Sequence, residues 1–273
     1  MIRSVTDLIE VIHKDSANWE QETKPWFRGE SDDKDRNQRP RPGPLCPRIA
    51  NYNTEQENHL LQSFRRQAGG LSEVPPRKYA DMWLFLAQHY GIPTRLLDWT
   101  EGALLALYFA INRGSPNPRV YMLNPRKLND LAGTRAPFPN YPLTWGEDNG
   151  SAQYIALAWQ RRRLLAWQQK LVRDIGIDLE VPIAFPATYQ DRRMIAQRSC
   201  FTIHGTLIGR LQDILTGKNV NLNDYLFEYR IDMDERNNIL KELSVLGVSA
   251  ATIFPDLDNL ASDLVSDLKL FNK

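Results

Sequence analysis

The segment Trp26-Phe27-Arg28-Gly29-Glu30 places an arginine and a glycine directly after two aromatic residues that are typical of a β-strand. A second segment, Gln88-His89-Tyr90-Gly91-Ile92-Pro93-Thr94-Arg95-Leu96-Leu97-Asp98-Trp99-Thr100, places Arg95 and Asp98 on either side of two leucines. A charged group in apolar surroundings is costly unless it is paired or used. We therefore interpret the charged residues of both segments as candidates for a ligand site.

The composition indicates one large soluble domain. The chain has 273 residues, with 34 basic and 33 acidic side chains and a net charge of +1, so there is no overall case for a nucleic-acid or anionic membrane partner. Cys46 and Cys200 are far apart and lack the spacing of a disulfide framework or a metal site. Because the N-terminus has no apolar signal core and no window is long enough to span a membrane, we expect a cytoplasmic protein.

Apolar periodicity predicts helices and strands without a regular alternation, which favours an α+β fold. Helices are expected over residues 6–19, 54–67, 78–90, 103–110, 152–173, 191–198, 234–246 and 256–271, and strands over 26–28, 95–99, 119–123, 181–185, 200–204, 225–231 and 250–254. Residues 1–25 are expected to be an N-terminal helical segment and residues 26–273 a single domain. The stretch 124–150 is rich in Pro, Gly and Asn and is a candidate lid or insertion.

Several common sites are absent at the level of motifs. The sequence has no GxxxxGK[ST] or GxGxxG phosphate loop, no HExxH or clustered His/Cys metal site, and no GxSxG elbow. These absences argue against a kinase, a metalloenzyme or an α/β-hydrolase.

Arg28, Asp98 and Thr100 are the first candidate site residues. Arg28 could present its planar fork to a carboxylate or phosphate, or form an internal ion pair, for example with Asp98. Asp98 and Thr100 stand where a strand gives way to a buried helix, so they could help to bind an anion at the helix N-terminus or merely cap that helix.

Other polar positions keep two interpretations open. Gln197 could read a ribose hydroxyl or an amide group, or satisfy a backbone turn. His89 is either a structural residue or a polar contact at a helix end. The basic stretches Arg36–Arg48 and Arg161–Arg163 are either solvated surface or contacts to phosphate groups.

Together these stretches resemble the FRG domain family, which takes its name from a Phe-Arg-Gly triplet, here Phe27-Arg28-Gly29. Residues 88–100 look like its central signature, 106–110 like the following helix, 197–204 like its third block and 252–258 like its closing element. The resemblance runs from about Trp26 to about Leu260. The third block often reads Gln-x-Gly-x-Phe, and here Ser199 replaces the glycine.

The family looks distantly similar to ADP-ribosyltransferases, including toxin-like and phage-defence proteins. This resemblance implies an ADP-ribosyltransferase-like mixed sheet core with helical elaborations, and NAD as the substrate without a metal. By position it assigns Arg28 to the dinucleotide, Thr100 to the nicotinamide pocket and Gln197 to the ribose. The glutamate expected of a strong transferase is not evident near Gln197.

The chemistry of NAD cleavage extends this implied site. Arg28, with Gly29 beside it, and Arg95 would suit the diphosphate, while His89 would add a polar contact. Trp99 or Tyr90 would wall the nicotinamide slot. Asp98 would supply a carboxylate if it faces the cleft.

Three functions follow as hypotheses. The first is an NAD-binding ADP-ribosyltransferase or NAD glycohydrolase, as a toxin or phage-defence effector with an unknown acceptor. The second is a non-catalytic module that recognises a nucleotide or ADP-ribose, and the third is a nucleic-acid-associated protein that uses the basic stretches.

Overall fold

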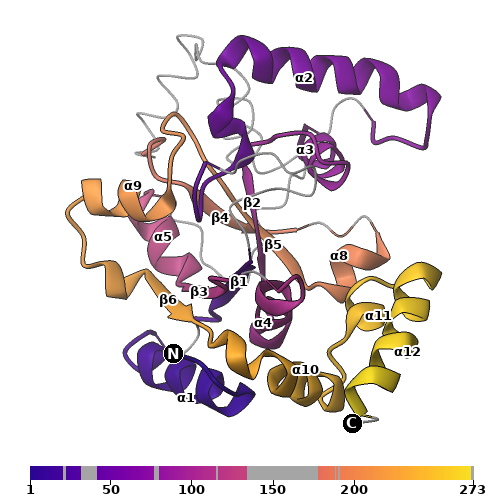
Figure 1. Ribbon diagram of the computed structural model, residues 1–273. Helices are drawn as coiled ribbons and strands as arrows, with labels where there is room; N and C mark the ends of the chain where they lie inside the picture. The colour runs from indigo at the N-terminus through magenta and orange to yellow at the C-terminus, as the bar shows by residue number, and fades with distance from the viewer. Residues whose placement is uncertain are drawn as a thin grey trace.

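The computed structural model describes residues 1–20, 23–31, 42–76, 80–114, 116–133, 178–187, 189 and 191–271 (Figure 1). Six strands form one sheet in the order β4-β5-β2-β1-β3-β6. Their bounds are β1 Trp26–Glu30, β2 Leu96–Thr100, β3 Arg119–Leu123, β4 Ile183–Pro186, β5 Ser199–Ile203 and β6 Leu226–Arg230.

The α+β class is confirmed, but the sheet is not mixed. Every pair of neighbouring strands in it is antiparallel. Within the described residues, parallel pairing occurs as an isolated bridge between Ile2 and Ile231.

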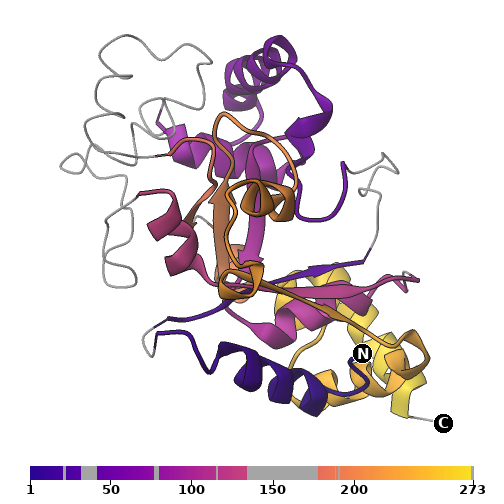
Figure 2. The ribbon, with the colours of Figure 1, turned by 90° about the vertical axis from the view of Figure 1, so that its left-hand side faces the viewer.

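The sheet is divided between β1 and β2. These two strands share one register pair, Phe27 with Thr100, whereas β1 and β3 pair along five positions, as do β2 and β5. The sheet therefore consists of two three-stranded halves, β4-β5-β2 and β1-β3-β6. Figure 2 shows these halves running steeply across one another.

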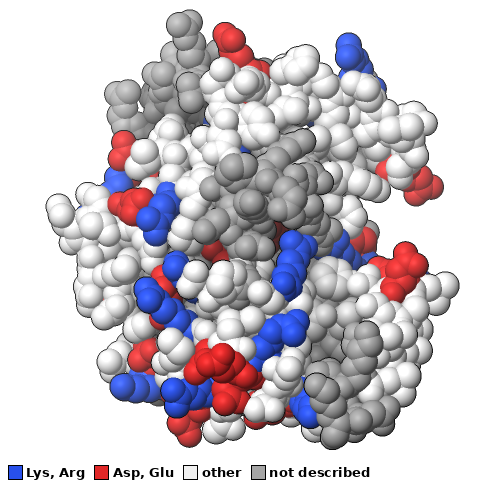
Figure 3. Space-filling view, viewed as in Figure 1, with Lys and Arg blue, Asp and Glu red and all other residues white. Residues whose placement is uncertain are grey.

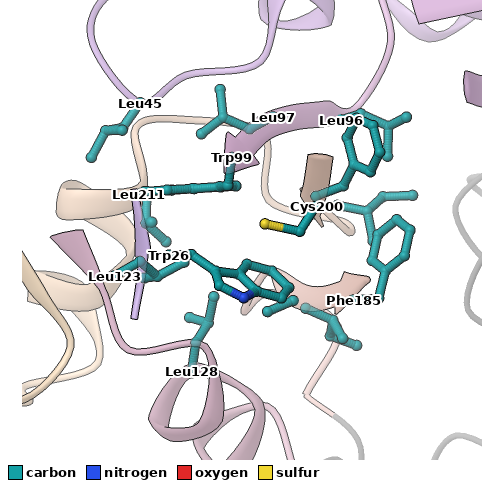
Figure 4. Packing of buried hydrophobic residues seen from close by; sticks show 14 of the residues in the cluster. Trp26, Leu45, Leu96, Leu97, Trp99, Leu123, Leu128, Phe185, Cys200 and Leu211 are labelled. Atoms are coloured by element: carbon teal, nitrogen blue, oxygen red, sulfur yellow. The ribbon is translucent and has the colours of Figure 1, made fainter. Parts of the chain in front are cut away.

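In the half-sheet β1-β3-β6, side chains alternate between two apolar cores on the two faces, as the twofold period of a strand requires, whereas the buried apolar side chains of β2, β4 and β5 all belong to the first core. In β1, Trp26 lies in the first core and Phe27 in the second; in β3, Tyr121 lies in the first core and Met122 in the second. Figure 4 shows part of the first core, in which Trp26, Trp99 and Cys200 lie close to one another, coming from β1, β2 and β5.

Helices cover both faces of the sheet. The first core receives side chains from α3 (Ala80–His89), α5 (Pro125–Leu131) and α9 (Leu211–Gly217), and the second from α1 (Val5–Ser16), α4 (Ala103–Ile111) and α10 (Arg236–Val245). The other helices are α2 (Thr54–Gln67), α8 (Arg192–Ala196), α11 (Ala250–Ile253), α12 (Leu257–Phe271) and the short 3-10 turns Arg48–Asn51, Ala68–Gly70, Leu222–Asp224 and Met233–Glu235. In the part of the chain that the structure describes, no helix combines the length and apolar character that a bilayer span requires.

Four details differ from the sequence prediction. The first helix begins at Val5 and is capped by Ser4 rather than Thr6. The predicted strand 250–254 is helix α11, because Ser249 and Thr252 form a capping box that starts a helical turn. Helix α9 was not predicted, and α5 occupies the start of the predicted connection 124–150. Residues 134–150 and the helix predicted over 152–173 lie outside the described residues.

Gly29 permits the close packing of α4 against β1. A Cβ atom built at this position would lie 1.9 Å from the carbonyl oxygen of Ala106 and 2.7 Å from the nitrogen of Ala110. Both are backbone atoms of the almost wholly apolar helix α4, so neither can rotate away. The helix can therefore rest directly on β1 only where the strand has no side chain.

We predict that Gly29→Ala destabilises the fold by about 3 kcal/mol, because α4 must move away from the sheet. Urea unfolding followed by circular dichroism measures this loss. Gly217→Ala is the matched control, since a Cβ there meets nothing within 4 Å. Equal unfolding midpoints for the two variants would contradict the packing argument.

Candidate functional site

Arg28 bridges the two diverging strands. Its Nε forms an ion pair with Oε1 of Glu30 at 2.8 Å, and its Nη1 donates a hydrogen bond to the backbone oxygen of Asp98 at 2.6 Å. The same Nη1 lies 3.8 Å from Oδ2 of Asp98. Glu30 Oε1 also accepts the backbone N–H of Leu45, which fixes the glutamate.

The Arg28 side chain is mostly buried, and its printed bonds use only part of the guanidinium. Nε and Nη1 are used by Glu30 and Asp98, while Nη2 makes no hydrogen bond to the residues that the structure describes. An arginine whose remaining N–H groups lie in one plane can bind two oxygens of a phosphate or carboxylate. The internal pairing of Arg28 is therefore confirmed, with Glu30 as its ion-pair partner and the Asp98 backbone as a second acceptor, while its binding of an anion stays a prediction.

Asp98 is held in place from the opposite side. Its side chain is exposed, and Oδ2 accepts a hydrogen bond of 3.0 Å from Nε2 of Gln88. Thr94 Oγ1 donates to Gln88 Oε1 at 2.5 Å and accepts the N–H of Leu96 at 3.2 Å. The central segment thus folds back on itself, which explains its polar residues at positions 88, 94 and 98.

Gln88 and Glu30 are site residues that the sequence analysis did not single out. Both stand inside the two quoted segments, next to residues that it did select. The available signal was a polar side chain within an apolar context, the same signal that selected Arg28 and Asp98.

Thr100 connects β2 to Gln197, which lies two residues before β5. Its Oγ1 donates to the backbone oxygen of Gln197 at 2.7 Å and accepts the N–H of Gly102 at 3.1 Å. Thr100 lies within β2, and the N-cap of α4 is Gly102, so the prediction of Thr100 as the helix cap was wrong. The Gln197 amide donates to the backbone oxygen of Ile253 at 3.4 Å, which ties it to α11.

His89 connects the end of α3 with the start of α8. Its Nδ1 lies 3.5 Å from Oδ2 of Asp191, which also caps α8 through the N–H of Met194. The exposed ring of Tyr90 stands edge-on to His89, with ring centroids 5.1 Å apart. Figure 3 shows the surface hollowed between α2 and the α8 region, with acidic and basic side chains beside the hollow.

Arg95 and Trp99 are instead part of the core. Both oxygens of Glu57 pair with Arg95, at 2.5 Å to Nε and 2.6 Å to Nη2, and Nη1 donates to the backbone oxygen of Gly205. The partner of Arg95 is thus Glu57 and not Asp98. Trp99 is buried and donates its indole N–H to Thr202 Oγ1 at 3.0 Å. Neither side chain is free to line a cleft.

The chemistry of the remaining reactive groups is limited. Burial raises the pKa of Cys46 to about 11 and raises the pKa of Cys200 well above its ordinary value, so both thiols are protonated near neutral pH. Within the described ranges, no cluster of His, Cys, Asp or Glu could hold a metal ion.

The fold and the polar cluster together define an α+β domain with an arginine-centred site at the junction of two half-sheets. Residues 23–118 match the family model of the FRG domain, and the chain therefore carries an FRG domain in this range. The match includes Arg28, Asp98 and Thr100 but ends before Gln197. Comparison with curated proteins and with solved structures finds no significant match.

His204 directly follows β5 and is buried. Its backbone N–H donates to the backbone oxygen of Arg95 at 3.0 Å. Burial lowers the pKa of His204 from 6.5 to about 3, and the charge of Arg95 acts in the same direction. The folded protein therefore keeps this imidazole neutral over a pH range in which the unfolded chain would protonate it.

We predict that stability falls as the pH drops below about 6.5 and continues to fall toward pH 3. The unfolded state binds one more proton in this window, which costs about 2 kcal/mol between pH 7.5 and pH 5. The measurement is the free energy of unfolding of the wild type and of His204→Gln at both pH values. The variant should lose this part of the pH dependence, whereas His59→Gln, at an exposed position on α2, should keep it. Parallel pH profiles for the wild type and His204→Gln would refute the prediction.

Proposed function

We propose that the protein binds NAD at the Arg28 cluster and acts as an ADP-ribosyltransferase or an NAD glycohydrolase. One observation carries the proposal. The three residues that the resemblance assigns, Arg28, Thr100 and Gln197, stand on β1, on β2 and two residues before β5, and these strands are adjacent. Hydrogen bonds connect them, from Arg28 to the β2 backbone and from Thr100 to the Gln197 backbone.

We extend the proposal to the fold, for which we propose an ADP-ribosyltransferase-like core. Its support is that the three motif positions follow one another on neighbouring strands in the order that an ADP-ribosyltransferase-like core requires. A toxin or phage-defence role with an unknown acceptor belongs to the same proposal.

The residue types suit cleavage of the bond between nicotinamide and ribose. In that step the C1′–N bond breaks, nicotinamide leaves with the electron pair, and positive charge develops on the ribose. Nη2 of Arg28 would hold the diphosphate, and the exposed Asp98 carboxylate would stabilise the developing cation. Water or an acceptor nucleophile then takes the ADP-ribosyl group and releases a proton.

A non-catalytic module for a nucleotide or ADP-ribose is the second candidate. Gln197 supports it, because a neutral amide stabilises a cation less than a carboxylate does and because this amide is already bonded to Ile253. For the nucleic-acid hypothesis, Arg161–Arg163 and residues 36–41 of the stretch Arg36–Arg48 lie outside the described residues, so it stays a prediction.

We predict that Arg28→Lys weakens NAD binding by roughly 10- to 100-fold, because lysine keeps the charge but loses the planar fork. Isothermal titration with NAD measures the dissociation constant, and circular dichroism reports the folded fraction. Arg119→Lys is the matched control, since Arg119 is also a strand arginine paired with a glutamate, Glu228 on the neighbouring strand. An unchanged affinity of folded Arg28→Lys would assign Arg28 a structural role only.

We predict that Asp98→Asn leaves NAD binding within a few-fold of the wild type and reduces nicotinamide release by at least about 100-fold. Asparagine can still accept the hydrogen bond from Gln88, but it lacks the charge that stabilises the transition state. Asp213→Asn on α9 is the control, because that aspartate is also exposed. Tight binding without nicotinamide release by the wild type would favour the recognition module, and absence of binding would reject both candidates.

A further inference from the structure

The last helix, α12, turns a row of leucines toward solvent. Leu257, Leu260, Leu264 and Leu268 are 81%, 43%, 61% and 64% exposed. Their spacing of three, four and four residues puts them on one face of the helix. Exposed Val265 lies next to this face. An apolar row of this length is unusual on a monomer surface and marks a site of association.

The rotation of α12 is fixed by a polar contact on its inner side. Asp263 accepts the backbone N–H groups of Ala250 and Ala251, at 3.3 and 3.2 Å, and so holds the N-terminus of α11. Asn259, one turn earlier, is half buried, and its side chain bonds to Asp256. The half-buried Asn259 and Asp263 thus lie on a different side of the helix from the exposed leucine row. Figure 1 shows α11 and α12 at the margin of the molecule near the C-terminus.

We propose that this leucine row is a homodimer interface, in which α12 pairs antiparallel with α12 of a second copy. A twofold interface must be complementary to itself, and a row centred on Leu264 meets this condition. Around the twofold axis Leu264 meets its own counterpart, and Leu260 meets the Leu268 of the other copy. Spacings of three and four residues also allow such side chains to interlock between two helices.

Charge complementarity favours the antiparallel direction. The helix sequence carries Asp258 in its first turn and Lys269 in its last. The C-terminal part of the helix also carries Asp267, so its sequence is mixed in charge. Antiparallel pairing brings Asp258 of one helix to the end that carries Lys269 in the other, and it opposes the two helix dipoles. A parallel pair would instead place like charges together at both ends.

The same charges argue against a lipid surface. Asp256, Asp258 and Asp263 make the polar side of this region acidic, whereas helices that lie on anionic membranes are rich in Lys and Arg. Val245 and Leu246 at the end of α10, a helix that contacts α12, are further exposed apolar residues. A second copy therefore fits this surface better than a bilayer does.

The oligomeric state of the full chain tests the proposal. Sedimentation equilibrium should show a concentration-dependent dimer, and Leu264→Glu should raise its dissociation constant at least tenfold. Leu71→Glu is the matched control, because Leu71 is a single leucine, 87% exposed, outside α12. A wild type that stays monomeric at all concentrations, or equal effects of the two variants, would overturn the proposal. So would binding of the wild type to phosphatidylglycerol vesicles that Leu264→Glu abolishes.

Cysteine crosslinking tests the direction of pairing. Leu264→Cys should form a disulfide-linked dimer on mild oxidation, because the two copies of residue 264 meet at the axis. Leu257→Cys should not, because its counterpart lies about 21 Å away along the antiparallel pair. Cys46 and Cys200 are buried and do not compete. Crosslinking of both variants would overturn the antiparallel arrangement, and crosslinking of neither would overturn the dimer.

Discussion

The separation of β1 from β2 is the constraint on which the rest of the structure depends. The two strands share a single register pair, so the sheet opens between its halves. Arg28 closes that opening by reaching from Glu30 to the Asp98 backbone. The resulting cluster lies at the junction of the two half-sheets. Its arrangement follows from the geometry of the strands rather than from a mobile loop.

Much of the fold could be predicted from local patterns. Strand β3 and helix α2 have the predicted bounds, because a short apolar run and a clear N-cap are each encoded within a few residues. Helix α11 was predicted as a strand, since its β-branched composition concealed a capping box. The antiparallel order of the sheet depends on contacts between distant segments and could not be predicted from periodicity.

The site was predictable as a set of residues but not as a set of contacts. Arg28, Asp98, Thr100 and Gln197 were selected because polar groups interrupt apolar segments, and the structure connects them. Arg95 was selected by the same reasoning and lies in the core, because Glu57, 38 residues away, pairs with it. A buried charge is thus a good indicator of an important residue, while only its partner reveals whether that residue is structural.

The bonds of Arg95 have a consequence for how the chain can be divided. Arg95, directly before β2, links α2 to Gly205, and Trp99 within β2 bonds to Thr202. Both acceptors lie beyond residue 118, where the match to the FRG domain ends. A fragment that stopped there would bury a guanidinium and an indole without these partners. The matched segment is therefore a unit of sequence similarity, whereas the unit of folding extends at least through β5. During synthesis on the ribosome, β5 must be completed before β2 can reach its final surroundings.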